Sequence, residues 1–344
     1  MSRNLLCLTV SAGLLGTAAW ADVPKVATDI APVHSLVSRV MQGVGEPALI
    51  VPSGATPHEY SLRPSEAAAI QDAEIVFWIG PDLTPWMGDA VQTLAANATV
   101  TTLMDVEGTT ELPFRESALF ETHAHGDDDH GHEEEHAEAH DHDHDHDHDE
   151  KAQDDHDHDH GHDHDETAHD DHGHGAHDPH AWLSPDNGAV WLNAIAAKLS
   201  AADPDNAGTY FANAAAAREE LDMLRTEIND ILAPVRGRNF IVFHDAYQYF
   251  ETSFDLPASG AISISDATDP SPARIAEIQA QVKEQDVSCV LSEPQFDPKI
   301  VAAVMDGSEA RTGVLDPLGS DLTPGPDLYS DVLRNLAKAL AGCL

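Results

Sequence analysis

The stretch from Asn206 to Leu232 reads NAGTYFANAAAAREELDMLRTEINDIL, and it decides the fold. It is rich in Ala, Glu, Leu and Arg and has neither a proline nor any glycine after Gly208, which favours one uninterrupted helix. At about 1.5 Å per residue, this helix is roughly 40 Å long, enough to run along two small lobes. We interpret it as a rigid connection between two lobes; an ordinary surface helix within one domain is the alternative.

Short apolar, β-prone runs alternate with helix-length segments on both sides of this stretch. Four precede it and four follow it: residues 25–30, 48–51, 74–79, 99–103, 239–244, 262–264, 288–292 and 313–316. Strands that alternate with helices indicate parallel sheets of the α/β class. The sequence therefore predicts an N-terminal lobe over residues 22–203, a connecting helix within 204–235 and a C-terminal lobe over 236–344.

The N-terminus has the features of a secretory signal peptide. Arg3 precedes an apolar run from Leu5 to Ala19, and the small-x-small ending Ala19-Trp20-Ala21 predicts cleavage after Ala21. The run is too short for a membrane span, which needs roughly 20 apolar residues. We therefore expect residues 1–21 to be removed and the mature chain to work outside the cytoplasm.

Two cysteines remain once Cys7 has left with the signal peptide. Cys289 and Cys343 form an even pair in an oxidising compartment, which predicts one disulfide that ties the last residues back to the fold. A thiolate metal site is the competing interpretation, but such a site usually has more cysteines at close spacing.

A tract of nearly alternating histidine and acidic residues runs from Glu121 to Asp178. It contributes −23 of the formal net charge of −44. Low hydrophobicity and dense like charge predict a disordered loop, inserted in the first lobe over residues 116–178, that offers many ligands to divalent metals. The acidity argues against nucleic acid or an anionic membrane as a partner. Outside the tract only four histidines remain: His34, His58, His180 and His244.

Three of those histidines occur in motifs at the predicted ends of strands or starts of helices. His58 lies in Gly54-Ala55-Thr56-Pro57-His58-Glu59-Tyr60, after a predicted strand. His180 precedes a helix with Ser184 as the expected N-cap and Pro185 as its first residue, and His244 ends the strand Asn239–His244. Asp316 closes the last strand in the same way. Since ligands bind at the carboxyl edge of open α/β sheets, these four side chains predict a metal site between the lobes.

Three imidazoles with one carboxylate or water suit Zn²⁺ in a tetrahedral shell, whereas Mn²⁺ prefers more oxygen ligands. We expect Asp316 to be the fourth ligand, with Glu59 as the alternative. Asp178 and Asp245 are candidate hydrogen-bond acceptors for the ligand imidazoles. His34 has no such motif around it and is interpreted as a residue at the start of a helix.

These motifs resemble the metal-binding cluster of periplasmic solute-binding proteins for ABC importers, and within it the high-affinity zinc-uptake (ZnuA-type) subfamily. Segments 54–65, 182–185 and 243–251 resemble the three histidine motifs of the family, and segments 292–296 and 315–319 resemble its second lobe. The resemblance covers essentially the whole mature chain. One departure is Pro57, because some zinc relatives have a carboxylate directly before the first histidine. It leaves the fourth ligand open.

The resemblance implies two (β/α)4-like lobes joined by one long helix, a Zn²⁺ site in the cleft between them, and delivery of zinc to the membrane permease of an ABC importer. It also implies a disulfide in the second lobe, which Cys289 and Cys343 would form. We expect a periplasmic monomer that is not an enzyme. Two alternatives are a periplasmic zinc buffer or chaperone without a dedicated transporter, and a secreted zinc hydrolase with Glu59 as the general base. The absence of a His-Glu-x-x-His motif speaks against the hydrolase.

Overall fold

The computed structural model describes residues 23–115, 177–263 and 270–344, and all of them belong to one compact unit. The predicted signal peptide and residues 116–176 of the predicted loop lie outside this part of the chain. The last two residues of that loop are part of the fold, since His177 pairs with Pro113 in an antiparallel bridge and Asp178 is buried. No helix among the described residues is long and apolar enough to cross a membrane.

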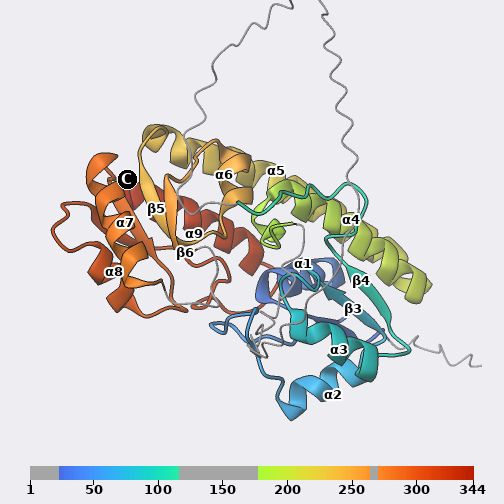
Figure 1. The fold of residues 1–344 in the computed structure, drawn as a ribbon. Coiled ribbons are helices and arrows are strands. Elements are labelled where there is room, and N and C mark those ends of the chain that lie inside the picture. The colour runs from blue at the N-terminus through green and yellow to red at the C-terminus, as the bar shows by residue number, and fades with distance from the viewer. Residues whose placement is uncertain (1–22, 116–176, 264–269) are drawn as a thin grey trace, which may run out of the picture. The chain divides into compact units, whose positions relative to one another are not determined.

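The first lobe is built on a parallel sheet with the strand order β2-β1-β3-β4. Its strands are β1 (Val26–Thr28), β2 (Ala48–Leu49), β3 (Ile75–Trp78) and β4 (Thr99–Thr102), and its helices are α1 (Ala31–Met41), α2 (Pro64–Asp72), α3 (Pro85–Leu94) and α4 (Pro185–Ala202). Ile75 and Phe77 belong to one hydrophobic cluster with residues of α1 and α4, whereas Val76 and Trp78 pack with α2 and α3. Both faces of the sheet are therefore covered, as parallel sheets require. Figure 1 shows α2 and α3 side by side.

The second lobe repeats this plan with the strand order β6-β5-β7-β8. Its strands are β5 (Phe240–His244), β6 (Gly260–Ser263), β7 (Cys289–Ser292) and β8 (Arg311–Val314), and its helices are α6 (Gln248–Phe254), α7 (Pro272–Glu284), α8 (Pro298–Val304) and α9 (Leu328–Cys343). Ile241 and Phe243 pack with residues of α7 and α8, and Phe240 and Val242 belong to the main core. The prediction of two four-stranded parallel sheets is confirmed.

All eight predicted strands are present, with shifted ends. β8 starts at Arg311, two residues before the predicted start, because its register pairs Arg311 with Cys289 of β7. It is a mostly exposed edge strand, so its first residues are polar and do not stand out as an apolar run in the sequence. β6 likewise starts at Gly260 and ends at Ser263, and Ile264 lies outside the described residues.

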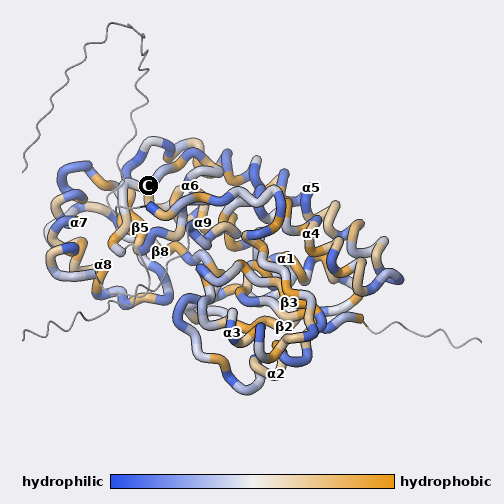
Figure 2. The backbone as a smooth tube through the Cα atoms, turned by 45° about the vertical axis from the view of Figure 1, so that its right-hand side comes forward, coloured by the Kyte–Doolittle hydropathy of each residue, from blue (hydrophilic) through white to orange (hydrophobic). Residues whose placement is uncertain are grey.

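The predicted long helix is α5 (Ala207–Leu232), with 26 residues. Its buried residues recur every three or four positions: Tyr210, Ala214, Ala217, Leu221, Leu224, Ile228 and Leu232. The same alternation is visible as hydrophobic and hydrophilic colour along α4 and α5 in Figure 2. Just before the helix, the turn η2 (Pro204–Asn206) is fixed by Asp203, which accepts hydrogen bonds from the Asn206 amide and the Tyr210 hydroxyl. The turn η3 (Ala233–Val235) follows it.

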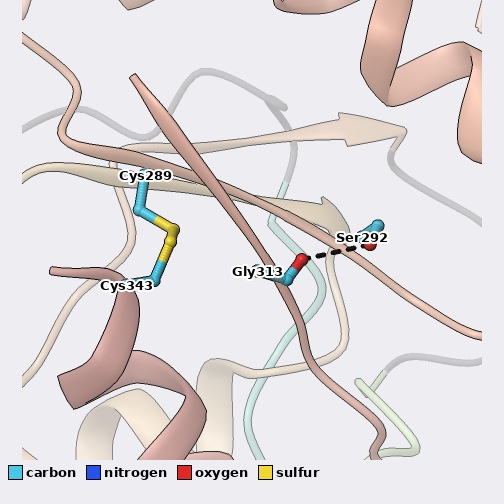
Figure 3. The surroundings of a disulfide bond; sticks show 4 residues. All are labelled: Cys289, Ser292, Gly313 and Cys343. Carbon is cyan, nitrogen blue, oxygen red and sulfur yellow. Dashed lines mark hydrogen bonds between the residues drawn. A yellow bond between two sulfur atoms is a disulfide. The ribbon is translucent and has the colours of Figure 1, made fainter. Parts of the chain in front are cut away.

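The last helix, α9, contacts both lobes. At its N-terminal end, the Tyr329 amide donates to Ser35 Oγ of α1 (2.9 Å), and the Tyr329 hydroxyl donates to the Trp182 carbonyl (2.8 Å). At its C-terminal end, Cys343 forms the predicted disulfide with Cys289 of β7 (Figure 3). Two helices, α5 and α9, thus run between the lobes, where the sequence predicted one.

The β8 strand is shaped to accommodate the disulfide. A Cβ atom on Gly313 would lie 3.0 Å from Leu291 Cδ2 and 3.3 Å from Cys343 Sγ, closer than ordinary contact. The Gly313 carbonyl accepts a hydrogen bond from Ser292 Oγ on β7 (Figure 3). A larger residue at this position would press the strand and the disulfide apart.

Candidate metal site

His58, His180 and His244 converge on one point, as the sequence predicted. One ring nitrogen from each lies within 4.8 Å of those of the other two. The Nε2 atom of His180 lies 3.4 Å from Nε2 of His58 and 3.4 Å from Nε2 of His244. Within the described residues this is the one group of three or more His, Cys, Asp or Glu side chains close enough to share an ion.

The first histidine is held on a loop that follows β2. Gly54 turns this loop with a φ of 85°, a conformation that favours glycine. Trp86 of α3 donates from Nε1 to the Pro57 carbonyl (2.8 Å), directly before His58. Tyr60 packs against the Trp86 ring and donates to Glu66 of α2 (2.8 Å). Two helices of the first lobe therefore fix the position of His58.

The second histidine is held by a buried carboxylate two residues before it. Asp178 Oδ1 accepts from both the backbone amide (3.0 Å) and the Nδ1 atom (2.7 Å) of His180. The chain then turns through η1 (Ala181–Leu183) into α4, with Ser184 as the N-cap and Pro185 as the first residue, which confirms that prediction. Trp182 donates from Nε1 to the Pro317 carbonyl of the second lobe (2.9 Å), so this turn also joins the lobes.

The third histidine is held by Glu293, which follows β7. Its Oε1 lies 2.7 Å from His244 Nδ1 and also accepts from the His244 amide (3.3 Å). The expectation that Asp245 accepts a hydrogen bond from the His244 imidazole is wrong, because Glu293 does so and the Asp245 carboxylate lies beside Arg115 (3.2 Å). The sequence signal for Glu293 is a glutamate directly after an apolar, β-prone run; the position of that strand beside the strand that ends in His244 came from the structure.

These carboxylates determine which atoms the two imidazoles present. When Nδ1–H donates to a carboxylate, the Nε2 atom carries the lone pair. In that tautomer the Nε2 lone pairs of His180 and His244 face each other across 3.4 Å, an arrangement that a cation between them stabilises. Ligands at tetrahedral angles, about 2.0–2.1 Å from Zn²⁺, are about 3.3–3.4 Å apart. The two measured Nε2 separations match that spacing.

A buried group of charges surrounds the two braced histidines. Arg115 pairs with Glu251 (2.7 Å) and Asp245 (3.2 Å), bringing the end of segment 111–115 against the start of the second lobe. Burial raises the pKa of Asp178 to about 7 and that of Asp245 to about 7, and Arg115 opposes both shifts. Burial also raises the pKa of Glu251. Because a nearby cation favours the ionised carboxylates, this acidic surrounding suits a divalent ion.

Neither predicted fourth ligand belongs to the histidine cluster. Asp316 Oδ1 accepts from the amides of Leu318 (3.1 Å) and Gly319 (3.0 Å), and its Oδ2 accepts from the amide of Ser320. Its carboxylate therefore organises the loop after β8. Glu59 is exposed. The identity of the fourth ligand stays a prediction.

The three histidines line a cavity of about 20 Å³ together with Trp182, Glu293, Gln295 and Phe296. A cavity of roughly 10–15 Å³ holds one water, so this one has room for about one ion or one water. Phe296 stacks on Phe243 (4.2 Å between ring centres) and lies edge-on to His244 (5.5 Å). His34 lies in α1 away from this cavity, where its Nε2 atom lies 3.1 Å from the Pro47 carbonyl.

The chain is similar to zinc-uptake proteins over nearly its whole length. A family profile described as ZnuA, zinc-uptake complex component A periplasmic, matches residues 26–343. The high-affinity zinc uptake system protein ZnuA of Brucella abortus (strain 2308) is 49% identical over 333 residues, covering 97% of this chain and 95% of that protein. The protein of the same name from Paracoccus denitrificans (strain Pd 1222) is 46% identical over 339 residues, covering 97% of each.

A solved structure with the same architecture is described as a crystal structure of ZnuA. It superposes with a TM-score of 0.68 at 24% sequence identity and covers 94% of this chain and 99% of that chain. At this level of identity the similarity concerns the fold alone. It agrees with the two parallel sheets and the long helix described above.

Proposed function

The chain belongs to the ZnuA family of periplasmic zinc-uptake components, and from this premise we propose that His58, His180 and His244 hold the Zn²⁺ ion that it carries. The observation that carries the proposal is the distance of 3.4 Å from His180 Nε2 to the Nε2 atoms of His58 and His244, which matches the edge of a tetrahedral zinc site. The protein is the periplasmic zinc-binding component of a zinc uptake system and delivers the ion to the ABC transporter.

Binding would join the two lobes, because the ligands come from both. His58 and His180 belong to the first lobe and His244 to the second. Both α5 and α9 contact each lobe, so a wide hinge opening would break their packing. The proposed change on release is therefore a modest rocking of the lobes with movement of loops, and the His58 loop is the most exposed of the three ligand segments.

Three further parts of the proposal rest on the sequence. Residues 1–21 are a signal peptide cleaved after Ala21. The mature chain is a monomer without enzymatic activity. The His-rich tract, which lies outside the described residues, binds additional Zn²⁺ weakly and raises the local zinc concentration near the cleft.

The test is a Zn²⁺ titration of the mature protein against a chelator of known affinity, with and without residues 124–176. His58→Ala and His244→Ala each remove one of three ligands, and His34→Gln is the matched control because His34 is a half-buried histidine outside the cluster. We expect one tight site that persists without the tract, weakens at least about 100-fold in both alanine variants and is unchanged in His34→Gln. A tight site that is indifferent to both alanine changes would refute the proposal.

Transport is tested separately from binding. The buffer or chaperone alternative uses the same site, so zinc uptake is measured in cells with and without the partner permease. Uptake that needs both this protein and the permease supports delivery. Uptake that is unaffected by loss of the permease supports the buffer.

A further inference from the structure

The proposed zinc site has three histidine ligands and a fourth position that neither predicted carboxylate reaches. The present inference concerns that position and rests on the proposed function. Both oxygens of Asp316 are used by the loop after β8, and bringing them to the ion would break three backbone hydrogen bonds. Glu59 is not among the residues that line the cavity. Glu293 lines the cavity, but its Oε1 is bound to His244. A water molecule is a fourth ligand of suitable size.

Gln295 is the residue in position to hold such a water. It lines the cavity together with the three histidines. It lies in the turn Glu293–Phe296, in which Glu293 braces His244 Nδ1 and Phe296 packs on the His244 ring. Thr56, the other neutral polar side chain on the wall of the cavity, already has an interaction partner. The turn that follows β7 thus contributes three residues to one site.

The orientation of the Gln295 amide is fixed by its neighbours. Its Nε2 atom donates to Ser320 Oγ (3.0 Å) and lies 3.5 Å from Asp316 Oδ1. A carboxylate only accepts hydrogen bonds, so the nitrogen must face Asp316 and the oxygen must face the other way. The Oε1 atom is buried and accepts no hydrogen bond from the described residues. A buried amide oxygen without a hydrogen bond costs free energy, unless a water or another donor binds it.

We infer that Gln295 is a positioning residue of the zinc site, and that its Oε1 accepts a hydrogen bond from the water that completes the coordination of the ion. Zn²⁺ polarises a bound water and makes it a strong donor. Loading then satisfies the Gln295 oxygen, and the oxygen holds the fourth ligand in place. The Nε2 atom of the same amide contacts residues of the loop 316–320. This loop therefore holds the water in place through Gln295, and Asp316 does not bind the ion directly.

The experiment compares two variants that separate the donor from the acceptor of this amide. Gln295→Met keeps the size of the side chain and removes both, whereas Gln295→Glu keeps an oxygen acceptor and removes the donor. Gln281→Met is the matched control, because Gln281 is also a buried amide with one bonded nitrogen (2.8 Å to the Ser259 carbonyl) and an unbonded oxygen, on α7 away from the cavity.

Zinc affinity is measured on the full mature chain in an excess of chelator that strips weak sites. We expect Gln295→Met to weaken binding about 10-fold, as loss of a residue that supports a ligand does, while Gln295→Glu and Gln281→Met stay within about threefold of wild type. The visible spectrum of the Co²⁺-loaded protein should shift in Gln295→Met and not in Gln281→Met, since only the former changes the coordination sphere.

Two results would overturn the inference. If Gln295→Glu is as weak as Gln295→Met, the residue acts only by bracing the loop through its nitrogen. If Gln295→Met binds zinc like wild type with an unchanged Co²⁺ spectrum, the oxygen has no role. Both results are distinct from failure of the proposed function, in which His244→Ala also leaves the tight site intact.

Discussion

The support that Glu293 gives to His244 can be tested by a single substitution, Glu293→Gln. In the wild-type protein, Glu293 Oε1 lies 2.7 Å from His244 Nδ1. A glutamine has the same size and still offers an oxygen to this nitrogen, but it carries no negative charge. A hydrogen bond to a charged group contributes about 1.5–3 kcal/mol and a neutral one about 0.5–1.5 kcal/mol. The midpoints of these ranges differ by about 1.25 kcal/mol, which corresponds to about an eightfold weaker zinc affinity.

The control is the same substitution at a carboxylate of equal burial. Glu251 is 5% exposed and Glu293 is 3% exposed, but Glu251 pairs with the Arg115 guanidinium and not with an imidazole. Zinc affinity of both variants is measured by chelator competition, and stability of the zinc-free forms by thermal unfolding. We expect Glu251→Gln to change affinity less than about threefold. Equal losses of affinity in the two variants, or none in Glu293→Gln, would show that Glu293 does not act through His244.

Three further predictions concern stability. Replacing Cys289 and Cys343 by serine opens a closed segment with a sequence separation of 54, so the free energy of unfolding should fall by about 4 kcal/mol in denaturant titrations; an unchanged midpoint would contradict this. Burial raises the pKa of Asp29 from 3.8 to about 7. Between these two pH values, the folded chain keeps the Asp29 proton and the unfolded chain has lost it. The stabilisation from this proton is fully present below about pH 4 and is lost as the pH rises through 7, with a slope of at most about 1.4 kcal/mol per pH unit. Asp29→Asn should remove this part of the dependence of unfolding free energy on pH. An unaltered dependence in the variant would contradict the prediction. In Gly188→Ala, the new Cβ would lie 2.5 Å from the Tyr329 hydroxyl, so the melting temperature should drop by the equivalent of about 1–3 kcal/mol, and an unchanged melting temperature would mean that α4 and α9 adjust freely.

The three histidines of the proposed site were predictable because each one carries local information. His58 stands in a Gly- and Pro-containing loop after a strand, His180 precedes a Ser-Pro helix start, and His244 ends an apolar run. Parallel strands place His58 and His244 at the carboxyl edges of their own sheets, but the meeting of these two edges came from the packing of the two lobes. The disulfide was similarly constrained, since two cysteines remained after Cys7 was assigned to the signal peptide.

The residues around the ligands were less predictable. Asp178 lies two residues before His180 and Asp245 directly follows His244, yet the Asp178 carboxylate binds the His180 imidazole whereas the Asp245 carboxylate lies beside Arg115. The brace of His244 comes from Glu293, 49 residues away, because β7 lies beside β5 in the sheet. Asp316 was predicted to end its strand, but β8 ends at Val314, and the amides of Leu318 and Gly319 bind the Asp316 carboxylate in the loop that follows. Hydrogen bonds within a tight loop are formed at little entropic cost, so they compete successfully with a distant site.

The two sets of strands, the long helix between them, the disulfide pair and the three histidines could all be predicted from the amino-acid sequence. These follow from residue periodicity, composition and local motifs, which depend on neighbours in the chain. The strand order, the second connection through α9, and the carboxylates and amides that surround the imidazoles became known from the folded structure. Those depend on contacts between segments far apart in sequence, and such contacts are set by how the sheets and helices pack, which no local pattern records.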